Sequence, residues 1–341
     1  MTIELPLLRL PPLLLALVLF ATPAAAAEMK FDWPVACTLG QSCWIVNYVD
    51  DDPSKTSAKD FKCGDMTYEG HDGTDIAIKD HKSIGNNISV LAAADGTVLK
   101  TRDSVEDGNG DAAALAAAEK ARQGCGNAVL ISHGNGWETL YCHMKKGSIS
   151  VTPGQPVRAG DKLGDVGQSG LAAFAHVHFG VMHNGKILDP FTGLPPEAGC
   201  GLKNISPLWS TPVAYNPLML YASGFSGDPP VYAQMLNDTS SPPHLPVNSP
   251  LMIFWILMDG AEPGDHISLK ILDPEGKPCA QADYIQDKKK ISQIRYIGHH
   301  TSEVPLLPGT YTGTATVLRE LPDGQNLKRS IESTVIVDAV K

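Results

Sequence analysis

The sequence has too few basic residues and too few long apolar runs for several classes of protein. It holds 27 Lys and Arg against 37 Asp and Glu, which gives a formal net charge of −10. A nucleic-acid-binding domain needs a basic face, so we expect no nucleic-acid partner. Beyond the first 27 residues, the apolar run at 251–258 is far shorter than the ~20 residues that a membrane-spanning helix needs.

The first 27 residues have the pattern of an export signal. Arg9 precedes an apolar run at residues 10–20, and a Thr-Pro pair and four alanines follow it. A charged start, an apolar core and a small-residue cleavage site are typical of a secretory signal peptide. We expect cleavage near Ala26 or Ala27, no membrane span afterwards, and a secreted or periplasmic protein. An uncleaved anchor is the alternative.

The seven cysteines agree with export, because disulfides form in oxidising compartments. Six of them precede residue 210, enough for three bridges, and Cys279 is left over. Cys125 and Cys142 flank a predicted hairpin and could pair across it if a bulge or twist adjusts the register. Zinc binding by cysteine is the alternative, and the absence of a CxxC pair disfavours it.

The length and the short apolar segments predict two mainly β domains after the signal. A chain of 341 residues fits roughly two domains of ~150 residues each. Residues 28–210 contain short β-like runs separated by glycine turns. These runs lie at 74–78, 128–131, 139–141 and 177–182, and a hairpin turn is predicted at 134–136. Residues 111–122, with seven alanines, predict one short helix inserted over the sheet.

The C-terminal part of the chain, residues 211–341, predicts a linker followed by a β-sandwich of immunoglobulin-like type. Residues 224–250 are rich in Pro, Ser and Asp, as at a domain boundary or in a long extended connection. Apolar strands are expected at 251–258, 266–272, 311–318 and 331–337, with a Pro-Asp-Gly turn between the last two. No cluster of catalytic residue types occurs in this part.

His71 and Asp75 are the first candidate metal ligands. Imidazole nitrogen and carboxylate oxygen are both common ligands of zinc. In an extended chain their α-carbons would lie ~13 Å apart, too far to share one ion. Gly73 and the β-like run at 74–78 argue against a helix. We therefore expect a bend at Gly73 that brings the two side chains to one point.

Three further histidines complete the candidate site. His176 and His178 are two residues apart, so on a strand they face the same side, and one can bind metal while the other lies just outside the coordination. His143 follows Tyr141 by two residues, and strand alternation predicts that both share a face. The glycine-rich segment 164–170 is expected to turn beside the cleft. Three protein ligands plus water are typical of catalytic zinc sites.

Four motifs together resemble the lysostaphin/LytM-type zinc endopeptidases over roughly residues 71–190. The motifs are His71-x-Gly73-x-Asp75, Ile131-Ser132-His133-Gly134-Asn135-Gly136, Thr139-Leu140-Tyr141-x-His143 and His176-x-His178-Phe179. The resemblance implies a mainly β, mostly antiparallel catalytic sheet of the duplicated-hybrid-motif type, with a groove lined by loops. Ala175 stands where the family usually has proline, and the insertion at 101–124 is expected to reshape one wall of the groove.

The resemblance also assigns roles to the five candidate residues. It implies one zinc ion per chain, held by His71, Asp75 and His178. His176 is then the candidate general base for water, and His143 the candidate for stabilising the oxyanion or protonating the leaving amine. These two roles could be exchanged.

Two nearby residues could serve either the site or the fold, and the structural role is favoured for both. Tyr141 could add a hydrogen bond, although strand packing is favoured. Asp189 could orient a ligand, although a turn is favoured.

The implied activity is hydrolysis of peptide bonds in peptidoglycan by metal-activated water, with stem-peptide cross-links as the expected target. Three alternatives remain. The protein could be a non-catalytic relative that regulates another wall hydrolase, or a secreted protease of other proteins. The C-terminal sandwich could also be a carbohydrate-binding or adhesion module. Peptidoglycan peptides are the expected substrate, and the C-terminal domain is a candidate site for a protein partner.

Overall fold

The computed structural model describes residues 29–301, 305–321 and 324–339. The predicted export signal and its cleavage site lie outside the described residues. Within those ranges, no helix is long and apolar enough to cross a membrane. The strands pair in antiparallel fashion apart from β12 (His244–Pro246) and β18 (Asn326–Asp338), which run parallel. The prediction of a mainly β, antiparallel fold is therefore confirmed.

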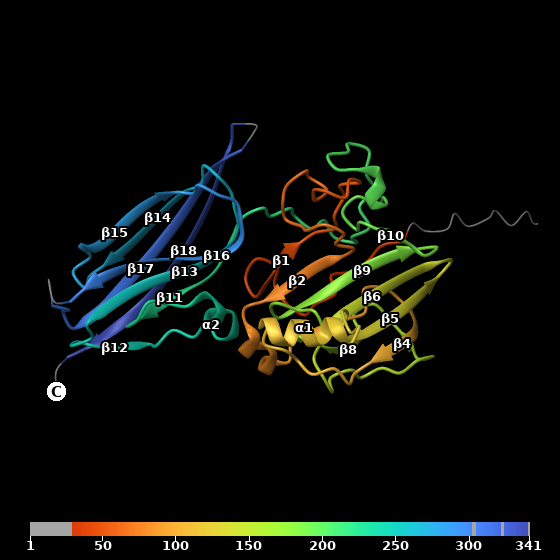
Figure 1. The fold of residues 1–341 in the computed structure, drawn as a ribbon, viewed down its shortest axis with the longest axis horizontal. Coiled ribbons are helices and arrows are strands. Elements are labelled where there is room, and N and C mark those ends of the chain that lie inside the picture. The colour runs from red at the N-terminus through yellow and green to blue at the C-terminus, as the bar shows by residue number, and fades with distance from the viewer. Residues whose placement is uncertain (1–28, 302–304, 322–323, 340–341) are drawn as a thin grey trace, which may run out of the picture.

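The N-terminal domain is built on an eight-stranded sheet with the order β1-β2-β9-β6-β5-β4-β7, and β10 also pairs with β9 (Figure 1). The strands are β1 (Cys43–Asn47), β2 (Thr74–Ile78), β4 (Gly96–Arg102), β5 (Asn127–Gly134), β6 (Trp137–Met144), β7 (Pro156–Val157), β9 (His176–His183) and β10 (Lys186–Leu188). A second small sheet pairs β3 (Ser89–Leu91) with β8 (Lys162–Asp165). One face of the central strands packs into the core through Ile76, Val177 and Phe179, all fully buried.

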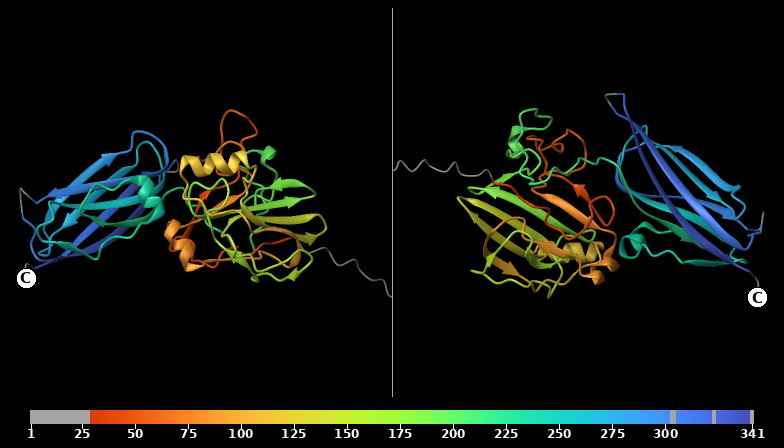
Figure 2. Two further views of the ribbon diagram at one scale, coloured as in Figure 1. Left: turned by 60° about the horizontal axis from the view of Figure 1, so that its bottom comes forward. Right: turned by 180° about the vertical axis from the view of Figure 1, so that it is seen from behind.

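Helices contribute little to this domain. The predicted alanine-rich helix is α1 (Ala112–Lys120), and the Asp111 carboxylate caps it by accepting a hydrogen bond from Ala114 N at 2.7 Å. It lies on the outside of the sheet, as the two views of Figure 2 show. Two short 3-10 helices, η1 (His81–Asn86) and η2 (Pro196–Ala198), lie in loops.

Three disulfides join the first six cysteines, as the cysteine count predicts. They are Cys37–Cys43, Cys63–Cys200 and Cys125–Cys142, and Cys279 is free. The expected irregularity beside the third bridge is present. The pairing of β5 with β6 shifts register between Asn127 and Val129, next to Cys125. This shift lets Cys125 meet Cys142 with α-carbons 4.9 Å apart.

The C-terminal domain contains two sheets that share one core (Figure 1). The three-stranded sheet is β11 (Met219–Ser226), β13 (Leu251–Ala261) and β16 (Lys290–His300). The five-stranded sheet has the order β12-β18-β17-β14-β15, with β14 (His266–Leu272), β15 (Pro278–Ile285) and β17 (Gly309–Glu320). The sheets approach so closely that a Cβ on Gly313 would lie 2.2 Å from the Phe254 ring. The immunoglobulin-like connectivity of this sandwich stays a prediction.

The stretch 224–250 is more than an extended connection, so that expectation was wrong. It holds the end of β11, the helix α2 (Tyr232–Asn237) and β12. Strand β13 is buried on both faces, because its outer face packs Trp255 and Leu257 against Met235 of α2. A short apolar helix in a polar, proline-rich stretch gives little periodic signal.

The two domains make direct contact along β1. The Trp44 ring stacks on Tyr221 of β11 with centroids 4.6 Å apart, and its Nε1 donates to Asp259 of β13 at 3.1 Å. The two domains also meet at Asp80, which accepts hydrogen bonds from the backbone N and the hydroxyl of Thr239. These contacts bury Trp44 although it lies on the edge strand of its sheet.

Candidate metal centre

The register of neighbouring strands brings distant residues into one row. Strands β2 and β9 pair so that Asp75 lies opposite His178, and Ala77 lies opposite His176. On its other side, β9 pairs with β6, which places Cys142 opposite His178. Asp75 and His178, which are 103 positions apart in the sequence, therefore meet in the middle of the sheet. Because strand side chains alternate, His176 and His178 project from the same face as Asp75.

His71 reaches the same row through a bend, as the sequence predicts. Gly73 lies in a bend between His71 and the start of β2. A Cβ at this position would lie 2.5 Å from His178 Nε2 and 2.8 Å from Phe179 O. Glycine is therefore required here because the chain passes tightly against β9.

The three predicted ligands form a compact, buried cluster. His71 Nε2 lies 3.1 Å from Asp75 Oδ1, and His178 Nδ1 lies 3.0 Å from the same oxygen. The two histidine nitrogens are 3.2 Å apart. His71 and Asp75 are each 3% exposed and His178 is 8% exposed. Among the described residues, this is the one group of three His, Cys, Asp or Glu side chains whose ligand atoms gather closely enough to hold a metal ion.

Two residues of β1 and its following loop orient the ligands. The His71 Nδ1 lies 2.6 Å from the backbone carbonyl of Tyr48. Since a carbonyl only accepts, Nδ1 must carry the proton and Nε2 offers its lone pair to the cluster. The Asn47 side-chain amide donates to Asp75 Oδ2 at 2.9 Å, which leaves Oδ1 for the cluster. Sequence reasoning missed both residues, since nothing in β1 resembles a metal motif.

The donor chemistry of the cluster fits a metal ion. Two imidazole nitrogens and a carboxylate oxygen point lone pairs at one small volume, an arrangement that requires a positive charge. Burial by itself lowers the pKa of His178, but hydrogen bonds to Asp72 and Asp75 outweigh it and raise that pKa to about 9. Burial raises the pKa of Asp75, but attraction to His71 and His176 whenever either ring is protonated, together with hydrogen bonds from His178 and His71, holds that pKa well below the usual range. The cluster thus attracts a cation, which can be a proton or a metal ion.

His143 and His176 lie beside the cluster with their rings 4.5 Å apart. His143 Nδ1 donates to Ser169 O and His176 Nδ1 donates to Phe174 O, both at 2.8 Å. Each ring therefore keeps an unprotonated Nε2, and that of His176 lies 3.6 Å from Asp75 Oδ1. Burial lowers the pKa of both, and nearby histidines help lower that of His143 to about 3. Both histidines are therefore neutral bases.

The face predicted for His143 was wrong. Tyr141 points into the core, where its hydroxyl accepts a hydrogen bond from Ala93 N and its ring lies 5.4 Å from Phe179. His143 instead contacts His176 on the opposite face. Its φ of 61° breaks the strand alternation at the end of β6. A positive φ at a non-glycine residue cannot be read from the sequence.

The other residues singled out by sequence serve the fold. Tyr141 packs in the core, as favoured. Asp189 caps a turn by accepting from Phe191 N at 2.8 Å, also as favoured. His133 binds Thr139 Oγ1 across the hairpin. The segment 164–170 is only partly a turn, because its first two residues belong to β8. The carbonyl of Ser169 in this segment accepts a hydrogen bond from His143 Nδ1.

A buried His-Asp-His cluster with two neutral histidines beside it, on an antiparallel sheet, can hold a metal ion in the way that metal-dependent hydrolases do. Residues 69–190 match the model of Peptidase family M23. The chain therefore contains an M23 peptidase domain, and the resemblance seen in its motifs is confirmed.

Comparison with known proteins gives short matches. The chain is 42% identical over 67 residues to the DD-carboxypeptidase/endopeptidase Mpg of Neisseria meningitidis serogroup B, covering 20% of this chain and 15% of that protein. It is 31% identical over 128 residues to the peptidoglycan DD-endopeptidase ShyA of Vibrio cholerae, covering 38% of this chain and 24% of that protein. The chain thus spans about a quarter or less of the length of these relatives. Among solved structures, the catalytic domain of lysostaphin from Staphylococcus simulans matches at 21% identity and a TM-score of 0.26, over 36% of this chain and 77% of that one.

Proposed function

We propose that this protein is an exported zinc-dependent endopeptidase that hydrolyses peptide bonds in peptidoglycan, with stem-peptide cross-links as its target. The main support is the convergence of His71, Asp75 and His178 within 4.8 Å of one another, beside two neutral histidines. Three nitrogen and oxygen ligands are typical of catalytic zinc sites. The names of the two relatives above support peptidoglycan as the substrate. The three disulfides support export.

The residues of the chain divide the chemistry between them. A bound zinc ion supplies Lewis acidity toward the scissile carbonyl and activates water at neutral pH. His176 accepts the proton of the attacking water at Nε2, since its Nδ1 is committed to Phe174 O. His143 has the same tautomer, so it can donate to the oxyanion or to the leaving amine only after its Nε2 has taken up a proton from solvent or from protonated His176, whose ring lies 4.5 Å away. Burial lowers the pKa of both imidazoles, so each is neutral before the reaction and has a free lone pair at Nε2.

The test uses the full chain after removal of its export signal. Zinc content is measured by elemental analysis, and purified peptidoglycan is digested and its fragments are identified by mass spectrometry. We expect one zinc per chain and fragments cut in the peptide portion. Chelation should abolish the release of fragments, and added zinc should restore it. A folded, zinc-loaded protein that leaves peptidoglycan intact but cleaves other proteins would overturn the substrate assignment.

Replacing His176 separates metal binding from turnover. His176→Ala should keep zinc and lower kcat by about 10²–10⁴-fold, the usual contribution of a general base. His183→Ala is the matched control, because His183 ends the same strand and stacks on Trp137 away from the cluster. A His176→Ala variant with full turnover would contradict the proposed role of this residue.

A further inference from the structure

His178 lies between two carboxylates. Its Nδ1 is 3.0 Å from Asp75 Oδ1, and its Nε2 is 3.2 Å from Asp72 Oδ1. In each of the other three histidines of the site, Nδ1 donates a hydrogen bond to a backbone carbonyl. The acceptors are Tyr48 O for His71, Ser169 O for His143 and Phe174 O for His176. Among these four rings, that of His178 therefore depends on a side chain for its orientation.

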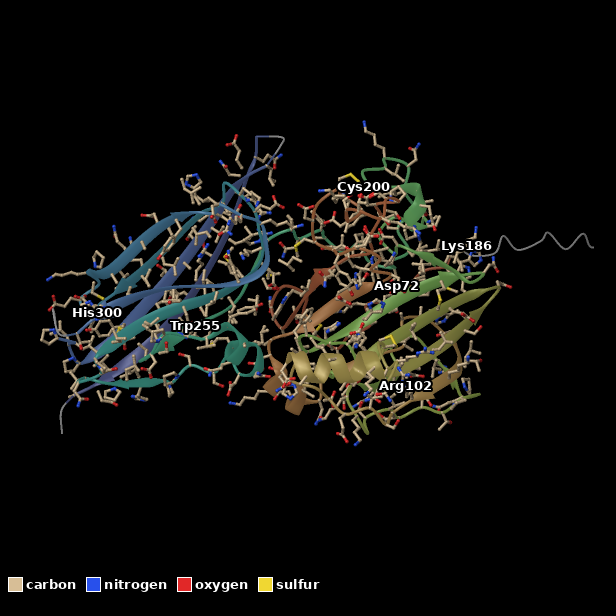
Figure 3. The ribbon with its side chains drawn as sticks, viewed as in Figure 1. Asp72, Arg102, Lys186, Cys200, Trp255 and His300 are labelled. Atoms are coloured by element: carbon tan, nitrogen blue, oxygen red, sulfur yellow. A yellow bond between two sulfur atoms is a disulfide. The ribbon has the colours of Figure 1, made fainter. Side chains whose placement is uncertain are left out.

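The main chain before β2 places Asp72 against this ring. Gly73 passes so close to His178 that a Cβ would lie 2.5 Å from Nε2 and 2.6 Å from Cε1. Asp72 directly precedes Gly73, so its carboxylate reaches the same edge of the imidazole, where β2 begins beside β9 (Figure 3). The Asp72 side chain is 59% exposed, so packing of the core does not explain an acid at this position.

We propose that Asp72 is a positioning residue for the metal centre. It accepts the Nε2–H of His178 and so fixes the tautomer in which the Nδ1 lone pair faces Asp75. A carboxylate partner also makes an imidazole a stronger metal ligand. Because Asp72 bonds to the ring nitrogen that points away from Asp75, it supports the ligand and does not join the cluster. This inference rests on the proposed function, since it assumes that the cluster holds zinc.

The experiment measures metal binding in the full chain after signal removal. Zinc affinity is determined by competition with a chromophoric chelator, and the ligand field by the visible spectrum of the cobalt-substituted protein. Asp72→Ala should weaken zinc binding by about 10–100-fold and change the cobalt spectrum. Asp72→Asn keeps an acceptor oxygen without the charge, so its loss should be smaller. Glu69→Ala is the control, because Glu69 is an exposed acid two residues before His71.

The outcomes distinguish this inference from the proposed function. If both Asp72 variants bind zinc as tightly as the wild type, Asp72 does not position the site. If zinc affinity is unchanged and KM rises, Asp72 contacts the substrate instead, and the inference is also overturned. An equal loss of zinc affinity in Glu69→Ala would mean a general effect of charge. A wild-type chain that binds no zinc would overturn the proposed function itself.

Discussion

Asp259 carries a pH-dependent cost at the contact between the two domains. It is 2% exposed, and its carboxylate accepts hydrogen bonds from Trp44 Nε1 at 3.1 Å and from the Ser292 hydroxyl. No cation pairs with it among the described residues. Burial therefore raises the pKa of Asp259 from 3.8 to about 7.

The direction and the size of this pH effect follow from the difference between the pKa of Asp259 in the folded chain and in the unfolded chain. Between pH 4 and pH 7 the unfolded chain is ionised at this position and the folded chain is still protonated. The contribution of Asp259 to stability is therefore most favourable below pH 4, becomes less favourable as the pH rises toward 7, and does not change further above pH 7. A pKa of about 7 in place of 3.8 corresponds to about 4 kcal/mol of unfolding free energy as an upper limit.

Asp259→Asn removes the charge and can keep both hydrogen bonds. The amide oxygen accepts from Trp44 Nε1, and the amide NH₂ donates to Ser292, because a hydroxyl both donates and accepts. The variant should match the wild type near pH 4 and be more stable by about 2–4 kcal/mol at pH 8.

Urea denaturation from pH 4 to pH 9, followed by tryptophan fluorescence, measures the difference between the two proteins. Asp283→Asn is the control, because Asp283 is exposed on β15 of the same domain and its change should give a small difference at every pH. If the difference between Asp259→Asn and the wild type is the same at pH 4 and pH 8, the buried carboxylate does not carry the predicted cost.

Two further substitutions test the supports of the site. Replacing both Cys125 and Cys142 by Ser should cost about 3 kcal/mol of stability in urea denaturation, because the bridge closes a loop of 17 residues. It should also lower kcat while zinc content stays at one per chain, since the backbone of His143 donates to Cys125 O at 2.8 Å; unchanged kcat would contradict this. Gly73→Ala should abolish zinc binding in elemental analysis, because its Cβ would lie 2.5 Å from His178 Nε2. Gly85→Ala is the control, with no atom within 4 Å of the added Cβ, and a zinc-loaded Gly73→Ala protein would show that β9 can move away.

Much of the fold could be predicted from local pattern. The strand at 74–78 was predicted with the bounds of β2, and that at 266–272 with the bounds of β14. The helix at 111–122 differs from α1 by one residue at its start and two at its end. These segments have clear apolar alternation or alanine content. Strand β16, at the edge of its sheet, shows mostly exposed and half-buried residues, and this weak pattern was missed.

The candidate metal ligands could be predicted from the sequence, but the residues that orient them could not. His71, Asp75 and His178 are chemically distinctive and stand at fixed short spacings, so their motifs can be recognised. Asn47 ends strand β1 and Tyr48 directly follows it, and neither stands in a recognisable metal-binding motif. Their roles arise only because β1 pairs with β2, a register that sequence does not reveal.

The contact between the domains and the metal centre share two segments, strand β1 and the residues just before β9. On β1, Trp44 stacks on Tyr221 of the C-terminal domain, and Asn47 holds Asp75. Phe174 packs in the same apolar group as Trp44, while its carbonyl and ring fix His176.

The C-terminal domain therefore packs against two segments that orient polar groups of the site, on the same face of the sheet as His176, because Trp44 pairs with Ala77 and Ala77 pairs with His176. Without it, Trp44 and its neighbours would face water, and the strand that positions Asn47 would become an open, apolar edge. By covering Trp44, the β-sandwich thus keeps the edge strand that positions Asn47 out of water, and this effect does not depend on a ligand of the sandwich.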